Sequence, residues 1–364
     1  MKNKKIMFYI SSLAKGGAQR VILNLTESLI RKGHRVTIVT TGKVENEYEL
    51  PKGVDRILSD ITEEEITSDR LGNFKKRFLK LRNIWKEEKP DVIISFIGKN
   101  NFMSILTSRG LNIPVLVSVR GEPLEEYYNK LLRFLAKYMF RMADGIILQT
   151  EDSKSFFPKS TIKKAVVLPN PLNPEFMKEI YQGEKEKKIV MVGRIDSNKN
   201  QKLVIDAFSS IAEKYSGYWL ELWGDGEDYE VLKEYISSLH MEHQIRMPGA
   251  TGNVREKIEN ASLYILSSNT EGMPNSLMEA MALGLACIST DCPCGGPKTL
   301  ITHGENGLLV PVEDRKAMEE AMEMVLKDAK LAKKIGENAL KIRETLSPDN
   351  VNDQWENYLI SKCR

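Results

Sequence analysis

The chain has 364 residues, of which 41% are hydrophobic and 28% charged, which fits a soluble globular protein with two domains of roughly 150–200 residues. No apolar run approaches the roughly 20 residues that cross a bilayer, and four cysteines without a repeating framework argue against a disulfide scaffold. Residues 1–168 hold 30 Lys and Arg against 19 Asp and Glu, a balance of +11, and the remainder holds 23 against 31, or −8. The basic half therefore predicts an anionic partner: nucleic acid, a membrane surface or a phosphorylated acceptor.

Short apolar runs rich in β-branched residues alternate with helical segments along the first half, as in a parallel sheet. The first run follows Lys2, Lys4 and Lys5 but lacks the cleavage site of a secretion signal, so we expect a cytoplasmic protein. Helices are predicted over Ala18–Lys32 and Asn73–Lys89. The predicted strands are Ile6–Ile10, Val36–Thr40, Val92–Phe96, Val115–Val119, Gly145–Gln149 and Ala165–Leu168.

The alternation restarts after an interruption at Pro169-Asn170-Pro171, which can continue neither a helix nor a central strand. We predict an α/β protein with two Rossmann-like, doubly wound domains facing across a cleft, residues 1–168 and 169–345. Residues 346–364 would form a helix returning to the first domain. The second set of strands is Lys188–Val192, Trp219–Trp223, Leu263–Leu266, Ala286–Ser289 and Gly307–Val310.

Three loops carry residues suited to a phosphorylated ligand. Gly16 and Gly17 follow the first strand and open a helix, where backbone N–H groups favour an anion. Arg194 and Lys199 follow a strand of the second half, and two cations on one loop suit a diphosphate. Each feature also fits an ordinary turn or a solvated loop.

The segment Glu271–Glu279 adds a turn and a predicted helix start, with Pro274 at the first helical position. Residues 275–279 would present backbone N–H groups to phosphate. Glu279, expected in the first helical turn, could accept hydrogen bonds from ribose hydroxyls, and Glu271 from sugar hydroxyls. Both glutamates could instead only stabilise the helix N-terminus, by about 0.3–1 kcal/mol each.

Together these motifs resemble retaining glycosyltransferase family 4, and Glu271–Pro311 is similar to members that build bacterial surface polysaccharides. The resemblance implies a GT-B fold, with a nucleotide-sugar donor bound mainly by the second domain. It implies that Arg194, Lys199 and Glu271 are catalytic: the two cations would hold the diphosphate and Glu271 the transferred sugar. Glu279 would hold the ribose, and Gly16 and Gly17 would close over the diphosphate. The remaining donor contacts would come from Gly272, Met273, Pro274, Asn275, Ser276 and Leu277.

The resemblance also implies the reaction. The donor would be a UDP-hexose or UDP-N-acetylhexosamine, and the acceptor a lipid-linked or growing bacterial glycan. Retention in this family needs no protein base. The sequence contains no Asp-x-Asp, and Cys292 and Cys294 lack a second pair of zinc ligands, so we expect neither a metal nor a required cofactor.

The family usually carries a histidine after a first-domain strand, where this chain has Arg120-Gly121-Glu122. Arg120 and Glu122 are candidate acceptor or sugar contacts, or alternatively a surface salt bridge.

Two basic, amphipathic segments suggest contact with an anionic membrane. Residues 70–89 hold eight Lys and Arg against two acidic residues, with Phe74, Phe78, Leu81 and Trp85 on one face. The second segment carries Leu131, Leu132, Leu135, Tyr138 and Met139. Each apolar face could equally pack against the protein core. A peripheral location on the inner face of the plasma membrane would follow from lipid contact.

Two rival functions remain open. A nucleotide-sugar epimerase would share the architecture, and a hinged sugar-binding protein would need an export signal. The sequence shows no recognised nucleic-acid-binding motif, and we expect no such partner.

Overall fold

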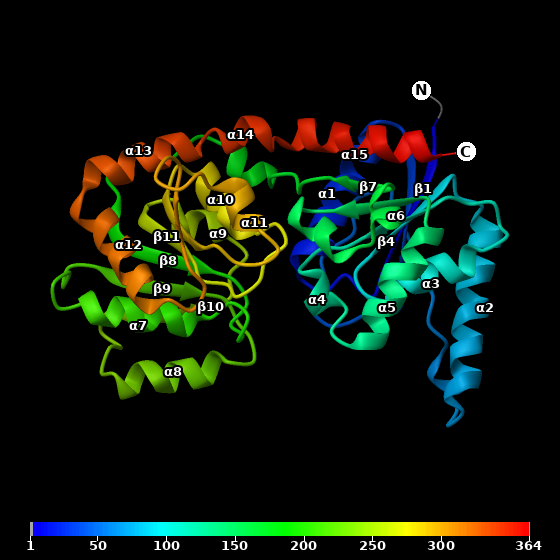
Figure 1. Cartoon of the computed structure of the whole chain (residues 1–364), viewed down its shortest axis with the longest axis horizontal. Helices are drawn as coiled ribbons and strands as arrows, with labels where there is room; N and C mark the ends of the chain where they lie inside the picture. The colour runs from blue at the N-terminus through cyan, green and yellow to red at the C-terminus, as the bar shows by residue number, and fades with distance from the viewer. Residues whose placement is uncertain (1–2, 364) are drawn as a thin grey trace. The chain divides into compact units, whose positions relative to one another are not determined.

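The computed structural model describes residues 3–363 and divides into two compact units. Unit 1 runs up to Pro171 and resumes at Asp349, and unit 2 spans Leu172–Pro348. The sequence placed these boundaries after residues 168 and 345. Each unit contains one parallel β-sheet with helices around it (Figure 1).

The sheet of unit 1 has seven strands in the order β3-β2-β1-β4-β5-β6-β7, all parallel. The chain reverses its direction of strand addition between β1 and β4, which makes the carboxyl ends of these strands a ligand-binding position. The strands are β1 (Lys5–Ile10), β2 (Arg35–Thr40), β3 (Asp55–Leu58), β4 (Val92–Phe96), β5 (Val115–Ser118), β6 (Gly145–Leu148) and β7 (Ala165–Val167).

Helices of unit 1 bury apolar side chains against this sheet. The core joins Met7 of β1 and Ile93 of β4 to Trp85, Phe102 and Phe140. The helices are α1 (Gly17–Arg31), α2 (Arg70–Glu88), α3 (Lys99–Ser108), α4 (Pro123–Glu126), α5 (Lys130–Met139), α6 (Lys159–Ile162) and α15 (Pro348–Lys362).

Unit 2 repeats the plan with six parallel strands in the order β10-β9-β8-β11-β12-β13. Its reversal lies between β8 and β11, so the loops after these two strands flank the expected ligand position. The strands are β8 (Glu186–Val192), β9 (Trp219–Trp223), β10 (Ile245–Gly249), β11 (Ala261–Leu266), β12 (Ala286–Thr290) and β13 (Leu308–Val310).

The helices of unit 2 lie on both faces of its sheet, with α7 and α8 on one side and α10 on the other (Figure 1). The core packs Val204 and Phe208 of α7 and Met322 of α12 against Ile189 and Ile265 of the central strands. The helices are α7 (Gln201–Ile211), α8 (Tyr229–Ser238), α9 (Val254–Ile258), α10 (Asn275–Ala282), α11 (Gly296–Leu300), α12 (Arg315–Lys327), α13 (Ala329–Ala339) and α14 (Ile342–Thr345).

The last helix, α15, packs in unit 1. Trp355 is fully buried, stacks on Phe96 with ring centroids 6.2 Å apart, and donates from Nε1 to the carbonyl of Pro169 over 2.9 Å. Glu356 accepts from His34 Nε2 over 2.9 Å and pairs with Lys32. Burial alone would raise the pKa of the Glu356 carboxyl, but these two partners bring it below its ordinary value.

The predicted fold class is confirmed: both units are Rossmann-like parallel sheets. Two strands were missed, β3 and β10, and both lie at sheet edges. Each carries polar residues in its run, because an edge strand has only one neighbour and keeps part of its surface in water.

In residues 3–363, every helix is too short or too polar to cross a membrane.

Candidate functional site

The loop after β8 is fixed by contacts with the end of β9. Gly193 donates its backbone N–H to Trp223 and Ile195 to Asp225, over 3.0 and 2.9 Å. A Cβ on Gly224 would lie 1.8 Å from the carbonyl oxygen of Gly193, so only glycine allows this close approach. The backbone from which Arg194 projects is therefore held firmly.

Asp196 connects the two candidate cations of this loop. Its Oδ2 lies 3.0 Å from Arg194 Nη2, and its Oδ1 accepts from the backbone N–H of Lys199 over 2.9 Å. The Arg194 side chain is 72% exposed. Its guanidinium is thus oriented by one carboxylate and keeps most of its surface open to a ligand.

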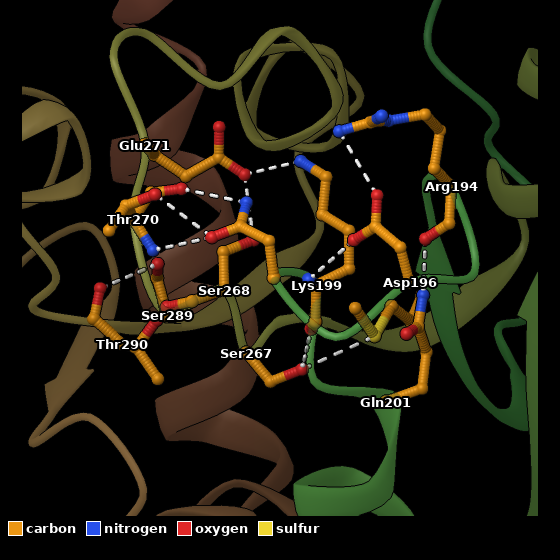
Figure 2. A network of polar contacts seen from close by, with 12 residues as sticks. Arg194, Asp196, Lys199, Gln201, Ser267, Ser268, Thr270, Glu271, Ser289 and Thr290 are labelled. Atoms are coloured by element: carbon orange, nitrogen blue, oxygen red, sulfur yellow. Dashed lines mark hydrogen bonds and ion pairs between the residues drawn. The ribbon is translucent and has the colours of Figure 1, made fainter. Parts of the chain in front are cut away.

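The central contact of the candidate site is an ion pair between Lys199 Nζ and Glu271 Oε1 (Figure 2). It joins the loop after β8 to the loop after β11, and the two side chains are only 15% and 12% exposed. Ser268 Oγ donates to the same Glu271 oxygen over 2.7 Å. The sequence-predicted residues Lys199 and Glu271 are therefore in direct contact at the reversal point of the unit 2 sheet.

Asn198 and Ser267 hold the two loops together. Asn198 Oδ1 accepts from Thr270 N and Oγ1 over 3.1 and 2.9 Å, and its Nδ2 donates to the Thr270 carbonyl over 3.2 Å. Ser267 Oγ donates to the carbonyls of Lys199 and Asn200 over 2.8 and 2.9 Å. These hydrogen bonds preorganise the Lys199–Glu271 pair.

The segment after β12 clamps Glu271 from the other side. The Glu271 N–H donates to the Pro293 carbonyl over 2.7 Å, and Cys294 returns a backbone hydrogen bond to the Glu271 carbonyl over 3.2 Å. A Cβ on Gly296 would lie 1.7 Å from the Gly272 oxygen, so glycine is required there too. Burial, with the charge of Glu271 nearby, raises the pKa of the Cys292 thiol to about 12, so this thiol is protonated near neutral pH.

Two sequence predictions about the start of α10 are wrong: the position of Pro274 and the position of Glu279. Pro274 is the residue before the helix rather than its first residue, and Met278 N–H already donates to the Pro274 carbonyl over 3.1 Å. The amide opening is therefore confined to Asn275–Leu277, and Glu279 lies beyond the first turn.

Glu279 is buried, with 3% of its surface exposed. Burial raises the pKa of the Tyr264 hydroxyl, and the charges of Glu279 and Glu271 raise it further. Both predicted glutamates therefore lie near Tyr264 of β11. Gly272 and Met273 lie in the turn between Glu271 and Pro274.

The other candidate residues belong to unit 1. Gly16 caps α1, which begins at Gly17. Glu122 caps α4 by accepting from Leu124 N over 3.2 Å. Glu126 was not among the predicted residues; its partly buried carboxylate accepts from Gly98 N and Arg120 N over 2.8 and 3.0 Å.

The Arg120 guanidinium is buried beside aromatic rings, not in a surface salt bridge. Its Cζ lies 5.3 Å from the Phe96 ring centroid and 5.5 Å from that of Trp355, and its Nη2 hydrogen-bonds Asn170 Oδ1. Burial lowers the pKa of Arg120 to about 9, although the Glu126 carboxylate opposes this. In the structure Arg120 connects β5 to the chain leaving unit 1.

The sequence of each unit matches a known family. Residues 15–176 match Glycosyltransferase Family 4, and residues 173–342 match Glycosyl transferases group 1. The chain belongs to the GT-B glycosyltransferases of this type. The residues that carried the sequence resemblance, from Gly16 to Pro311, lie within these two matches.

Named relatives of this glycosyltransferase span almost its whole length. It is 28% identical over 356 residues to a Campylobacter jejuni enzyme named GalNAc-alpha-(1->4)-GalNAc-alpha-(1->3)-diNAcBac-PP-undecaprenol alpha-1,4-N-acetyl-D-galactosaminyltransferase, covering 96% of this chain and 97% of the relative. A second C. jejuni enzyme, named N-acetylgalactosamine-N,N'-diacetylbacillosaminyl-diphospho-undecaprenol 4-alpha-N-acetylgalactosaminyltransferase, is 26% identical, over 91% of this chain and 92% of that one.

A solved structure confirms the fold. Anabaena Alr3699/HepE, crystallised with UDP-glucose, superposes with a TM-score of 0.83 over 99% of this chain and 100% of that one. The sequence identity is 17%, so this likeness concerns the fold alone.

Proposed function

We propose that this glycosyltransferase moves a sugar from a UDP-linked donor to a lipid-linked or growing bacterial glycan, with retention of anomeric configuration. Lys199, Arg194 and Glu271 are the proposed catalytic residues, and Glu279 with Gly272–Leu277 the proposed donor contacts. The observation that carries the proposal is the Lys199–Glu271 ion pair, which lies in unit 2 at the carboxyl ends of β8 and β11.

The residue types suit the departure of a diphosphate. Breaking a glycosyl–phosphate bond develops negative charge on the leaving group, which fixed cations and helix N–H groups stabilise. An ammonium has three N–H bonds, so Lys199 can donate to a phosphate oxygen while still donating to Glu271. Arg194 is exposed and oriented by Asp196, and its planar guanidinium can bind a second phosphate oxygen.

The relatives support the substrate classes. The two C. jejuni enzymes are named for acceptors that carry undecaprenol through a diphosphate. The Anabaena protein of the same fold was crystallised with UDP-glucose. A UDP-sugar donor and a polyprenyl-linked acceptor are therefore the first substrates to test.

A thermal-shift screen of UDP-, GDP- and ADP-sugars tests the donor. A ligand that binds the folded state at 100 times its dissociation constant stabilises it by about 2.7 kcal/mol, so the true donor raises the melting temperature. We expect the shift with a UDP-sugar and not with its GDP or ADP counterpart. If every nucleotide sugar leaves the melting temperature unchanged, the proposed donor class is wrong.

The reaction is then followed with the donor found and a synthetic polyprenyl-diphosphate glycan, by NMR of the new linkage. Retention gives an α-linked product from an α-linked donor, and we expect activity to survive EDTA. A β-linked product or loss of activity with EDTA would contradict the mechanism. Isomerised donor formed without acceptor would indicate an epimerase instead.

A further inference from the structure

A stripe of exposed apolar side chains runs along α4, α5 and the turns beside them. On α5, Leu131, Phe134 and Tyr138 follow one another at spacings of three and four residues, so they share one side of the helix. Leu124 and Tyr128 precede this helix and are separated from it by non-helical backbone, and Met142 follows it in a short 3-10 helix. Each keeps between 40% and 66% of its surface exposed. The apolar stripe consists of Leu124, Tyr128, Leu131, Phe134, Tyr138 and Met142.

The apolar stripe is not needed to attach α5 to the protein. The opposite side of the helix buries Ala136 fully and packs Leu132, Leu135 and Met139 against the core of unit 1. The residues predicted for this segment come from both sides of α5 and do not include Phe134, whose ring centroid lies 4.5 Å from that of Tyr138. The structure therefore separates a packed face from an exposed one.

Basic residues accompany the apolar stripe. Lys130, Arg133, Lys137 and Arg141 fall between Tyr127 and Ala143, a stretch without Asp or Glu, whereas the exposed Glu125 lies beside Leu124 at the other end of the stripe. Lys130 and Arg141 are exposed. An amphipathic helix with aromatic and leucine side chains amid cations matches the boundary between lipid headgroups and acyl chains.

The other basic segment, α2, fits this role less well. Leu81 and Trp85 of α2 are buried in the core. Several of its cations are engaged within the protein, since Arg77 pairs with Asp60 and Arg82 donates to the carbonyls of Thr107 and Arg109. Of its exposed apolar residues, Leu71 and Phe74 are three residues apart on one side of the helix, whereas Leu79 lies five residues further on and faces another side.

We propose that the apolar stripe on α4–α5, with Lys130 and Arg141, is a docking surface for an anionic lipid bilayer. The charge of the first half, +11 over residues 1–168, favours a negatively charged partner over a neutral one. The proposal goes beyond the transfer reaction and does not depend on it, because bilayer binding is measured without donor or acceptor.

Vesicle flotation of the full chain tests the proposal. We expect the protein to float with vesicles of phosphatidylglycerol and phosphatidylcholine at 0.1 M salt and to bind weakly to phosphatidylcholine alone, since screening and headgroup charge control this attraction. Leu131→Ser combined with Phe134→Ser should reduce binding by roughly tenfold or more. Lys130→Ser with Arg141→Ser should weaken it and lower its salt dependence.

The matched control is Leu71→Ser with Phe74→Ser, an equal loss of exposed apolar surface on α2, which should float like the parent. Melting curves confirm that the variants are folded. The proposal is overturned if the parent does not float, if the Leu131/Phe134 variant floats equally well, or if the α2 control abolishes binding. Light scattering that shows a dimer dissociated by the Leu131/Phe134 variant, without flotation, would assign the stripe to self-association.

Discussion

Lys199 and Glu271 form a largely buried ion pair, and such a pair can serve stability, chemistry or both. Removing one partner leaves the other charge poorly solvated, which costs more than the pair contributes. A single substitution therefore confounds the two roles. A variant that removes both charges separates them.

We predict that Lys199→Met destabilises the protein by about 3 kcal/mol and that Lys199→Met with Glu271→Gln recovers most of that loss. Turnover should fall by roughly 10²–10³-fold in both variants, because the missing cation no longer stabilises the leaving diphosphate. Urea unfolding and kcat measure the two effects. Recovered turnover in the double variant would show that the pair is only structural.

Ser268 offers a test of positioning with a matched control. Its Oγ donates to Glu271 Oε1 over 2.7 Å, whereas the equally buried Ser289 donates to the Thr290 carbonyl over 3.1 Å. Both Ser→Ala changes should cost about 1 kcal/mol of stability. Only Ser268→Ala should lower kcat, by roughly tenfold, because it frees the Glu271 carboxylate to move. Equal turnover in the two variants would argue against a positioning role.

Acid sensitivity should depend on Glu47. Arg56 donates to both of its oxygens, over 2.5 and 3.0 Å, and lowers the pKa of the Glu47 carboxyl to about 2 from 4.5. A folded-state pKa below the unfolded value adds stability above pH 4.5 and loses it as the pH falls toward 2. Glu47→Gln should therefore flatten the pH dependence of urea unfolding in this window. Glu49→Gln, at an exposed position, should leave the curve of the parent unchanged.

The residues of the candidate site could be read from the sequence because each stands at a strand end or a glycine turn. Lys199 and Glu271, which were expected to hold different parts of the donor, are in direct contact in the structure. Asn198 and Ser268 were missed, although both are polar residues placed just after the central strands of unit 2. Arg120 could not be interpreted, since its partners Phe96, Asn170 and Trp355 are distant in sequence and only the fold brings them together.

At the level of elements, every central strand and the apolar edge strands β7 and β13 were predicted, whereas the more polar edge strands β3 and β10 were missed. β4 and β9 were predicted with the bounds observed, because continuous apolar runs mark strands covered on both faces. In α2, by contrast, the apolar spacing alone could not decide between lipid and core. The structure shows that this face packs partly in the core: Leu81 and Trp85 are buried, whereas Phe74 remains exposed.

The packing of α15 in unit 1 depends mainly on the side chain of Trp355. Trp355→Ala should destabilise unit 1 by about 3–5 kcal/mol, since it removes a buried ring, its stacking on Phe96 and the hydrogen bond to Pro169. Trp355→Phe should cost about 1–2 kcal/mol, mainly the hydrogen bond. Gln354→Ala, on the exposed side, is the control. Urea unfolding measures all three, and a neutral Trp355→Ala would contradict the packing argument.

At the scale of the molecule, the two proposed functions, donor binding and membrane docking, belong to different units, each with its own core. The proposed donor contacts lie almost wholly in unit 2, whereas the exposed apolar stripe and the excess positive charge lie in unit 1. The charge balance of the halves was visible in the sequence. Which apolar side chains stay exposed was not, because exposure depends on how each helix packs.

Hydrogen exchange with and without the donor tests this division. Binding should slow exchange of the backbone amides of residues 193–200 and 267–277, because a ligand that holds these loops suppresses their local opening. The amides of α5 should exchange at unchanged rates, and slower exchange at Gly16 and Gly17 would support their expected contact with the diphosphate. The Lys199→Met, Glu271→Gln variant is the control and should show little protection at the same donor concentration. If the donor slows exchange only in unit 1, the donor binds there and the proposed site in unit 2 is wrong.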